Sequence, residues 1–193
     1  VLVVGCDVAD DAGVRRMINE VDSVFGRLDA LVNNAAMTYF VEHSDLEGLT
    51  EAMWDRMLAV NLKGAFFVTR AAARLLRASG SGSVVNVSSV AAMTGNGSSI
   101  AYCATKAGLN TMTKSLARVL APEVRVYAVC PGPTHSRWIK QGNPDWDIDE
   151  MVADYPIPRA SEPDDIADAV IFFCTATRMA TGQILAVDGG QTL

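Results

Sequence analysis

Tyr102 and Lys106 stand four residues apart in a segment with the apolar spacing of a helix, and Ser89 precedes the tyrosine by 13 residues. A free tyrosine has a pKa near 10, which is too high for efficient proton transfer at neutral pH. Helical spacing puts the lysine ammonium roughly 5–6 Å away, where its charge favours the phenolate and lowers that pKa. A serine at a strand end can offer its hydroxyl to the same substrate oxygen. The three residues predict a proton-transfer site, although most Tyr-x-x-x-Lys pairs, taken alone, are an aromatic ring packed under a lysine stem.

The elements that must position these residues alternate between strands and helices. Apolar runs predict strands over Val1–Gly5, Leu28–Asn33, Ser83–Val87, Val124–Cys130 and Gln183–Val187. Helical spacing and caps predict helices from Asp10 to Gly26, from Thr50 to Ala78 with a bend near Gly64, over Ile100–Leu120, and over Asp164–Thr177 after a capping box at Ser161. The stretch Pro131–Arg159 reads as irregular. This alternation predicts an α/β fold with a parallel sheet and helices on both faces.

Three unusual loop sequences each follow a predicted strand. They are Asn33-Asn34-Ala35-Ala36, Ser88-Ser89 and Pro131-Gly132. In open α/β sheets, ligands bind at the carboxyl ends of the strands. We therefore expect a ligand cleft at this edge, which makes a chemical role for Tyr102 more plausible than the spacing alone does.

Composition narrows the classes of partner. At 193 residues the chain is expected to form one domain, and its net charge of −6 argues against nucleic acid or an anionic membrane surface as the main partner. No apolar run approaches the ~20 residues that span a bilayer. The four cysteines lack metal-ligand spacing, which favours reduced thiols in a cytoplasmic protein and predicts neither zinc nor disulfides.

The motifs together resemble the short-chain dehydrogenase/reductases, in the ordinary rather than the extended branch of that family. The resemblance rests on Asp7-Val8, Asn33-Asn34-Ala35-Ala36, Asn61-Leu62-Lys63-Gly64, Ser89, Tyr102-Cys103-Ala104-Thr105-Lys106, Pro131-Gly132, Thr181-Gly182-Gln183 and Asp188-Gly189-Gly190. The motifs keep the family's order over the whole chain and look most like those of 3-oxoacyl-(acyl-carrier-protein) reductases. The resemblance implies a Rossmann-type doubly wound parallel sheet.

The resemblance also implies a role for each catalytic candidate. Tyr102 would be the general acid/base, and Lys106 would lower its pKa and hydrogen-bond the nicotinamide ribose. Ser89 would hold the carbonyl or alcohol oxygen where charge develops. Asn61 would anchor a water that links Lys106 to solvent; the alternative is an amide that pins a helix bend before Gly64.

The implied cofactor is NAD or NADP. Asp7 would accept a hydrogen bond from the adenine amino group, unless it is only a turn residue, and Val8 would give a backbone contact. Asn34 and Ala35 would line the adenosine side, while Ala36 replaces the glycine usual in the family. The nicotinamide end would meet Pro131, Gly132, Thr134 and Ser136, the last standing where threonine is usual. The family assigns nothing to His43 and His135, and we expect both to be loop or surface residues.

Substrate specificity is expected in a loop over about residues 133–160. Its apolar side chains either form a wall for the substrate or pack against the domain or a neighbouring subunit: Trp138, Ile139, Trp146, Met151 and Tyr155.

The predicted activity is hydride transfer between the nicotinamide and a small carbonyl/alcohol substrate, with 3-oxoacyl thioester reduction as one candidate. The alternatives are a sugar, steroid or small-alcohol substrate, or a non-catalytic oligomer partner that no longer binds cofactor. Family members commonly form tetramers or dimers through the two long helices, so a homo-oligomer is expected.

One half of the family pattern is missing from the sequence. We expect residues 1–193 to form a single catalytic domain that lacks its first two βα units, because no Gly-x-x-x-Gly-x-Gly turn for the pyrophosphate occurs. In the family order 3-2-1-4-5-6-7, Val1–Gly5 would be the third strand and would have no neighbour to pair with. The expectation is a fragment of a roughly 250-residue enzyme, since two such units amount to about 60 residues.

Overall fold

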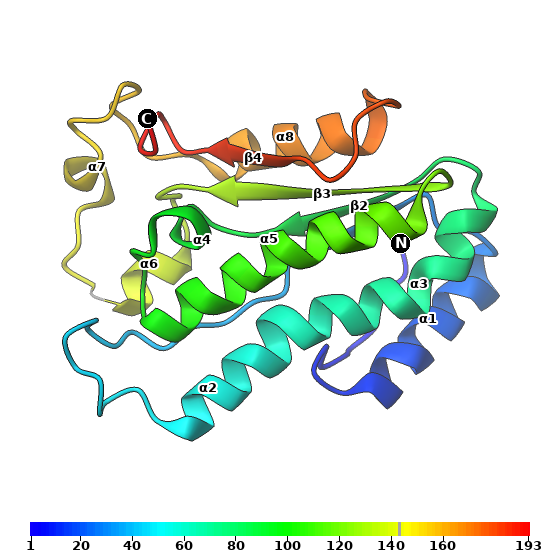
Figure 1. Ribbon diagram of the computed structural model, residues 1–193, viewed down its shortest axis with the longest axis horizontal. Coiled ribbons are helices and arrows are strands. Elements are labelled where there is room, and N and C mark those ends of the chain that lie inside the picture. The colour runs from blue at the N-terminus through cyan, green and yellow to red at the C-terminus, as the bar shows by residue number, and fades with distance from the viewer. Residues whose placement is uncertain (143) are drawn as a thin grey trace.

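The computed structural model describes residues 1–142 and 144–193; residue 143, inside the predicted substrate loop, lies outside the described residues. One sheet of parallel strands runs in the order β1-β2-β3-β4, and Figure 1 labels the last three of them. The strands are β1 (Ala30–Asn33), β2 (Gly82–Val87), β3 (Val124–Pro131) and β4 (Ile184–Val187). The helices are α1 (Asp11–Phe25), α2 (Glu51–Met57), the π-helix η1 (Leu58–Gly64), α3 (Ala65–Ala78), α4 (Ala91–Thr94), α5 (Ile100–Leu120), α6 (Arg137–Gly142), α7 (Ile148–Met151) and α8 (Pro163–Thr175). The predicted α/β class with a parallel sheet is confirmed.

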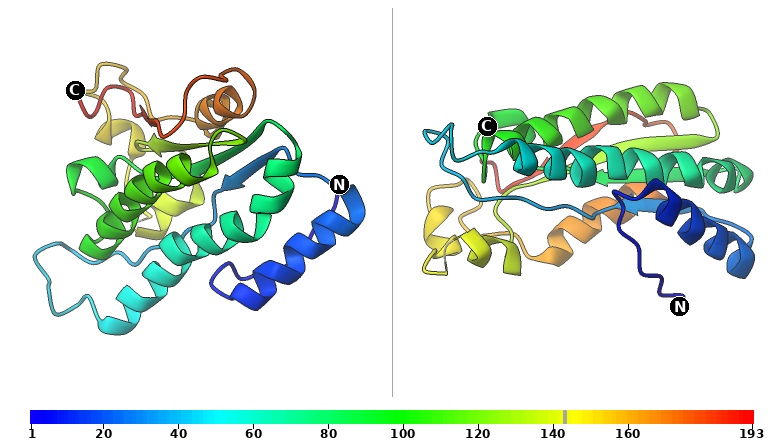
Figure 2. Two further views of the ribbon diagram at one scale, coloured as in Figure 1. Left: turned by 45° about the vertical axis from the view of Figure 1, so that its right-hand side comes forward. Right: turned by 90° about the horizontal axis from the view of Figure 1, so that it is seen from below.

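The sheet carries a separate core on each face because successive side chains of a strand point to opposite sides. Val84 and its register partner Val126 pack with α1, α3 and α5 on one face. Val85 and its partner Tyr127 pack with α8 on the other, where the Tyr127 ring stacks on a ring of that helix. Figure 2 shows the long helices and α8 on opposite sides of the strands. Helices on both faces of the sheet are therefore confirmed.

Several predicted helix boundaries are confirmed at their caps. Asp10 accepts a hydrogen bond from the Ala12 amide at the start of α1, and Gly26 ends that helix in the left-handed conformation with φ 65°. Thr50 caps α2. The predicted bend near Gly64 takes the form of the seven-residue π-helix η1 between α2 and α3. Such π-helical turns are rare and occur frequently at functional sites.

Three predictions of secondary structure were wrong. Val1–Gly5 forms no strand: within the described residues no strand lies beside it, and an unpaired strand would leave its backbone groups without partners. This segment protrudes from the body of the protein (Figure 2). The helix predicted from Asp164 starts instead after Glu162, whose amide donates to the Asp165 carboxylate at 2.8 Å, because Pro163 suits the first helical position. The stretch predicted to be irregular contains the short helices α6 and α7.

A row of buried polar side chains ties the sheet to its helices. The Asn33 amide donates to Thr69 Oγ1 on α3 at 3.0 Å and to Asn86 Oδ1 on β2 at 2.8 Å. Asn86, which is fully buried, donates in turn to Thr113 Oγ1 on α5 at 2.8 Å. Buried polar groups stabilise a fold only while every member keeps a partner. The row therefore fixes the β1 end, where the candidate site begins, against both long helices.

Replacing Asn86 with alanine tests this role. The Asn86→Ala variant should lose about 2–4 kcal/mol of unfolding free energy, because Asn33 and Thr113 would each lose a buried partner. Urea denaturation followed by circular dichroism measures the change. Asn96→Ala is the matched control, since Asn96 is exposed and its side chain has no hydrogen bond among the described residues. Equal midpoints for the two variants would contradict the role.

Candidate active site

Parallel strands end at one edge of the sheet, and the three unusual loop sequences meet there. Figure 1 shows α4, α6 and α7 gathered at that end. The Ser88 amide donates to the Val129 carbonyl at 2.7 Å and the Val90 amide to the Pro131 carbonyl at 3.0 Å, so the Ser88-Ser89 turn is fixed to the end of β3. The Gly132 amide donates to Val187 of β4 at 3.0 Å. The predicted cluster of loops at this edge is thus present.

Tyr102 lies in the first turn of α5 and contacts Ser89. The buried Ser99 caps the helix and accepts a hydrogen bond from the Tyr102 amide at 3.3 Å, which fixes where the tyrosine enters the site. The Trp138 ring of α6 lies 5.9 Å from the Tyr102 ring, centre to centre, at a tilt of 51°. Burial raises the pKa of Tyr102 to about 12, while the Ser89 hydrogen bond pulls in the opposite direction. The phenol is therefore neutral at neutral pH.

Lys106 lies under the same ring, in the interior. Its Nζ is 5.7 Å from the centre of the Tyr102 ring and donates to the Val87 carbonyl at 2.8 Å, with the residue only 3% exposed. Burial lowers the pKa of Lys106 to about 8. The predicted distance between cation and ring is found, but the predicted lowering of the tyrosine pKa is not, because the loss of solvent around the phenol outweighs the Ser89 hydrogen bond that favours the phenolate.

Asn61 sits in the middle of η1 and is almost fully buried. Its side chain accepts from the Met37 amide and donates to the Met37 carbonyl, both at 2.8 Å, and it also donates to Thr105 Oγ1 on α5 at 3.2 Å. These contacts hold the loop after β1 against the two long helices. They match the alternative reading of an amide that pins the helix bend; the water-anchoring role stays a prediction.

The adenosine-side candidates come from the segment before α1 and from the loop after β1. Asp7 accepts from the Ala9 amide at 3.0 Å and pairs with Arg56 of α2 at 3.1 Å; that backbone hydrogen bond, followed by Arg56, lowers its pKa. Val8 packs on Gly64, where an added Cβ would come within 2.8 Å of Val8 Cγ2. Asn34 and Ala35 are exposed just beyond β1. Sequence reasoning missed Arg56, which no motif marks.

The nicotinamide-side candidates follow β3. Gly132 approaches Asp188 so closely that an added Cβ would lie 2.9 Å from the Asp188 Cα. Thr134 donates to the Gly132 carbonyl at 3.0 Å, which closes the turn after Pro131. Ser136 is exposed and stands just before α6. Pro131 and Gly132 therefore lie at the sheet edge, while Thr134 and Ser136 lie at the start of the loop over residues 133–160.

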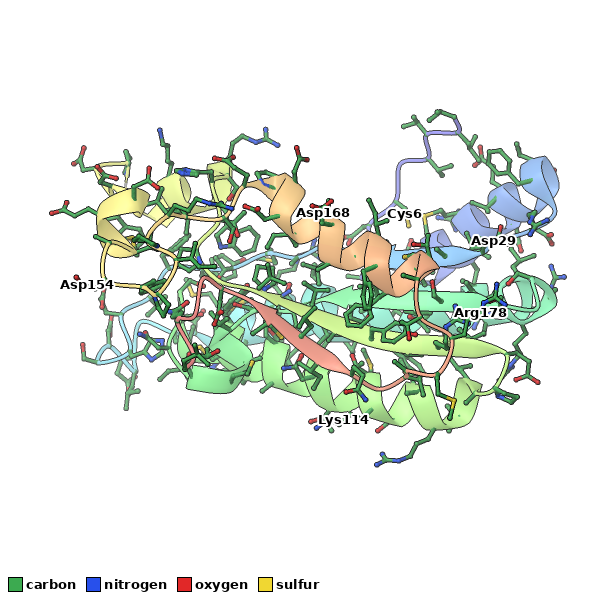
Figure 3. All side chains as sticks on the ribbon, turned by 90° about the horizontal axis from the view of Figure 1, so that it is seen from above. Cys6, Asp29, Lys114, Asp154, Asp168 and Arg178 are labelled. Atoms are coloured by element: carbon green, nitrogen blue, oxygen red, sulfur yellow. The ribbon has the colours of Figure 1, made fainter. Side chains whose placement is uncertain are left out.

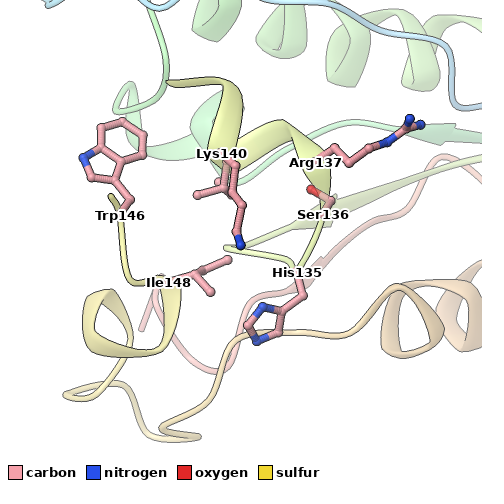
Figure 4. A pocket seen from close by; sticks show the side chains of 7 residues that line it. His135, Ser136, Arg137, Lys140, Trp146 and Ile148 are labelled. Atoms are coloured by element: carbon pink, nitrogen blue, oxygen red, sulfur yellow. The ribbon is translucent and has the colours of Figure 1, made fainter. Parts of the chain in front are cut away.

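The loop over residues 133–160 contains a cavity of about 330 Å³ beside α6, shown in Figure 4. Its lining residues are His135, Ser136, Arg137, Ile139, Lys140, Trp146 and Ile148. None of the catalytic candidates lines it. The predicted apolar wall is divided: Trp138 contacts Tyr102 and Trp146 contacts Phe40 at 6.1 Å, whereas Ile139 and Tyr155 pack on the loop's own small core and Met151 is exposed.

Among the described residues, neither histidine contacts one of the four catalytic candidates through a hydrogen bond or ion pair. His43 Nε2 is 3.1 Å from the Gly97 carbonyl, and His135 Nε2 is 3.2 Å from Asp149 and 3.9 Å from Glu162. Within the described residues no cluster of potential metal ligands occurs, and no helix there is long and apolar enough to cross a membrane.

Comparison with known proteins places this arrangement in a family. A family model described as enoyl-(acyl carrier protein) reductase matches residues 1–192. A protein of Streptomyces violaceoruber, named as ketoacyl reductase 2 of the granaticin polyketide synthase, is 41% identical over 193 residues, which is 100% of this chain and 77% of that protein. A crystal structure named as a short-chain dehydrogenase/reductase from Burkholderia xenovorans has a TM-score of 0.91 at 39% identity and covers 98% of this chain and 75% of its own. The structure of ElxO with NADP bound has a TM-score of 0.87 at 28% identity, covering 95% and 75%.

A parallel sheet with helices on both faces and with its candidate site at the carboxyl edge belongs to the Rossmann-like α/β class. The chain belongs to the short-chain dehydrogenase/reductase family.

Burial of the Lys106 ammonium should lower the free energy of unfolding. The difference between the ordinary lysine pKa of about 10.4 and the value of about 8 for Lys106 corresponds to ~3 kcal/mol. That cost is full below pH ~8, where both the folded and the unfolded chain are protonated, and it disappears as the pH rises towards ~10.4. Lys106→Met should therefore stabilise the fold at pH 7 by about 1–3 kcal/mol, since the lost hydrogen bond to Val87 offsets part of the gain.

Urea denaturation at pH 7 and pH 10 measures this effect, and the gain should shrink at the higher pH. Lys114→Met is the matched control, because Lys114 is exposed on the same helix (Figure 3). A Lys106→Met protein that is less stable than the parent at both pH values would show that the ammonium stabilises the fold.

Proposed function

We propose that the protein is an NAD(P)-dependent oxidoreductase that interconverts a carbonyl and an alcohol, with Tyr102 as the general acid/base. The observation that carries the proposal is the joint placement of the Ser89 hydroxyl, the Tyr102 phenol and the buried Lys106 ammonium at one sheet edge. The name of the ElxO structure with NADP bound supports the choice of cofactor.

The residues present fit the nicotinamide half of such a cofactor. An ammonium has three donors, and among the described residues the Val87 carbonyl is the one acceptor that Lys106 Nζ contacts, so two donors remain for ribose hydroxyls. The exposed Asn34 and Ala35 would line the adenosine side, with Asp7 and Val8 at the adenine. Pro131, Gly132, Thr134 and Ser136 would meet the nicotinamide end. A bound nicotinamide would supply or accept the hydride.

The acid–base step follows from the protonation states. In carbonyl reduction, the neutral Tyr102 phenol donates its proton to the substrate oxygen while Ser89 donates a second hydrogen bond to that oxygen. The phenolate that forms is stabilised by the Lys106 charge nearby. Alcohol oxidation runs the same steps in reverse. Asn61 would keep the loop after β1 and α5 in place around this group.

Tyr102→Phe tests the proton transfer directly. Turnover should fall about 10²–10⁴-fold, because the variant cannot give or take the proton, while NADH or NADPH titrated against protein fluorescence should bind as before. Tyr127→Phe is the matched control: its hydroxyl donates to the Ala180 carbonyl on the α8 side of the sheet. Unchanged turnover in Tyr102→Phe would refute the role. A parent chain that binds neither cofactor would instead favour the non-catalytic alternative.

The lysine pKa predicts a pH dependence. Lys106 loses its charge as the pH rises through about 8, and the phenolate formed during reduction then loses its stabilisation. The kcat/KM for NAD(P)H-dependent carbonyl reduction should therefore fall with rising pH around this value. Initial rates between about pH 6 and 10 measure the profile, and a profile that is flat across this range would rule out a charged Lys106 in the step.

The substrate class follows from the loop over residues 133–160, which we propose as the specificity loop. Trp138 presents aromatic surface beside Tyr102, and the second tryptophan of the loop, Trp146, packs against Phe40. An apolar carbonyl substrate suits this surface, and the relative named as a ketoacyl reductase makes a 3-oxoacyl thioester a specific candidate.

We also propose a cytoplasmic homo-oligomer, a tetramer or a dimer, that associates through the helices spanning Thr50–Ala78 and Ile100–Leu120.

A further inference from the structure

A buried amide lies one helical turn beyond Lys106. Asn110 of α5 is 7% exposed, and its Nδ2 and Oδ1 atoms are both 3.7 Å from the Cys130 Sγ of β3. In the described part of the chain, this thiol is the only hydrogen-bond partner of the Asn110 side chain. A buried amide without a partner is costly, so the thiol contact matters more than its length suggests.

Cys130 lies beneath the turn that carries Ser89. It is fully buried and directly precedes Pro131, whose carbonyl accepts the Val90 amide. Burial raises the pKa of the Cys130 thiol, while hydrogen bonds with the Ser88 side chain, the Asn110 side chain and the Ser89 backbone oppose that rise. The thiol is therefore protonated and can donate and accept at once.

The same turn has two further ties to α5. The Ser88 hydroxyl donates to the Lys106 carbonyl at 3.2 Å, and Lys106 Nζ donates to the Val87 carbonyl at 2.8 Å. Both ties connect β2 to the helix at Lys106. The Cys130–Asn110 contact adds a tie from β3 one turn further on. Together with the Asn86–Thr113 hydrogen bond further along, these contacts hold successive turns of α5 against the strand ends, and the Cys130–Asn110 contact is the one that involves the residue just before Pro131.

We propose that Cys130 and Asn110 are positioning residues, whose thiol–amide contact holds the Ser89 turn at a fixed place relative to the turns of α5 that carry Tyr102 and Lys106. Neither residue touches the substrate in this proposal, which rests on the proposed function. Alanine at position 130 leaves the Asn110 amide unpaired and a gap beneath Ser89, so the serine hydroxyl drifts from the phenol. Serine keeps a donor and an acceptor at the same place.

Activity measurements on Cys130→Ala and Cys130→Ser separate positioning from simple packing. Cys130→Ala should lower kcat about tenfold with the KM for NAD(P)H changed less than about twofold, and Cys130→Ser should recover most of the loss. Cys174→Ala is the matched control, since Cys174 packs against the α8 core on the opposite face. An equal kcat for Cys130→Ala and Cys174→Ala would overturn the proposal, as would an equal loss in the alanine and serine variants.

Two readouts do not depend on turnover. Hydrogen–deuterium exchange of the Val90 amide should quicken in Cys130→Ala and in Asn110→Ala, and the ¹³C-lysine NMR titration of Lys106 should shift in both. The double variant should show no larger change than either single one, because both remove the same contact. If Tyr102→Phe kept full activity, the proposed function would be refuted. The Val90 exchange and the Lys106 titration would still test whether Cys130 and Asn110 hold the Ser89 turn in place. Unchanged exchange and an unchanged lysine titration would overturn that positioning role.

Discussion

The burial of one ammonium group governs the layout of this protein. Lys106 is 3% exposed and its Nζ contacts the last carbonyl of β2, so a charged group occupies the interior where strand, helix and loop meet. Taking an ammonium out of water costs free energy that one hydrogen bond cannot return. A chain that keeps such a group needs rigid elements around it, and these are present. The buried row of Asn33, Asn86 and Thr113 joins β1, β2 and α5, and Asn61 joins the loop after β1 to the same helix.

The tyrosine shows how the same burial acts on an acid. Desolvation raises the pKa of the Tyr102 phenol to about 12 and lowers that of the lysine to about 8, because in each case the uncharged form is favoured. The pair therefore rests with a neutral phenol, which is the form that gives a proton to a carbonyl oxygen. Alcohol oxidation would need a phenolate, so that reaction depends on groups that stabilise the anion. The Ser89 hydrogen bond is the one that already acts on Tyr102.

Much of this arrangement could be predicted from the sequence, because it depends on local signals. Asp10, Gly26 and Thr50 mark helix ends through their own backbone chemistry, and the helix Ile100–Leu120 has the bounds that its apolar spacing predicts. The contacts that decide the electrostatics could not be predicted. Arg56 reaches Asp7 across 49 residues, and Trp138 reaches Tyr102 from a segment without periodic pattern. The sign of the tyrosine pKa shift was missed because spacing reports the distance to a charge and not the amount of water removed.

The position of Trp138 joins the electrostatics of the site to its selectivity. The Trp138 ring beside Tyr102 contributes to the burial that raises the phenol pKa, and it belongs to the loop that the proposal assigns to substrate recognition. A substrate that packs on this ring would keep water away from the Tyr102 phenol, and the phenol would then stay protonated until hydride moves. A small polar substrate would leave water beside the phenol and weaken every charge interaction there. The proposed preference for apolar carbonyl compounds would then act through the chemical step as well as through binding.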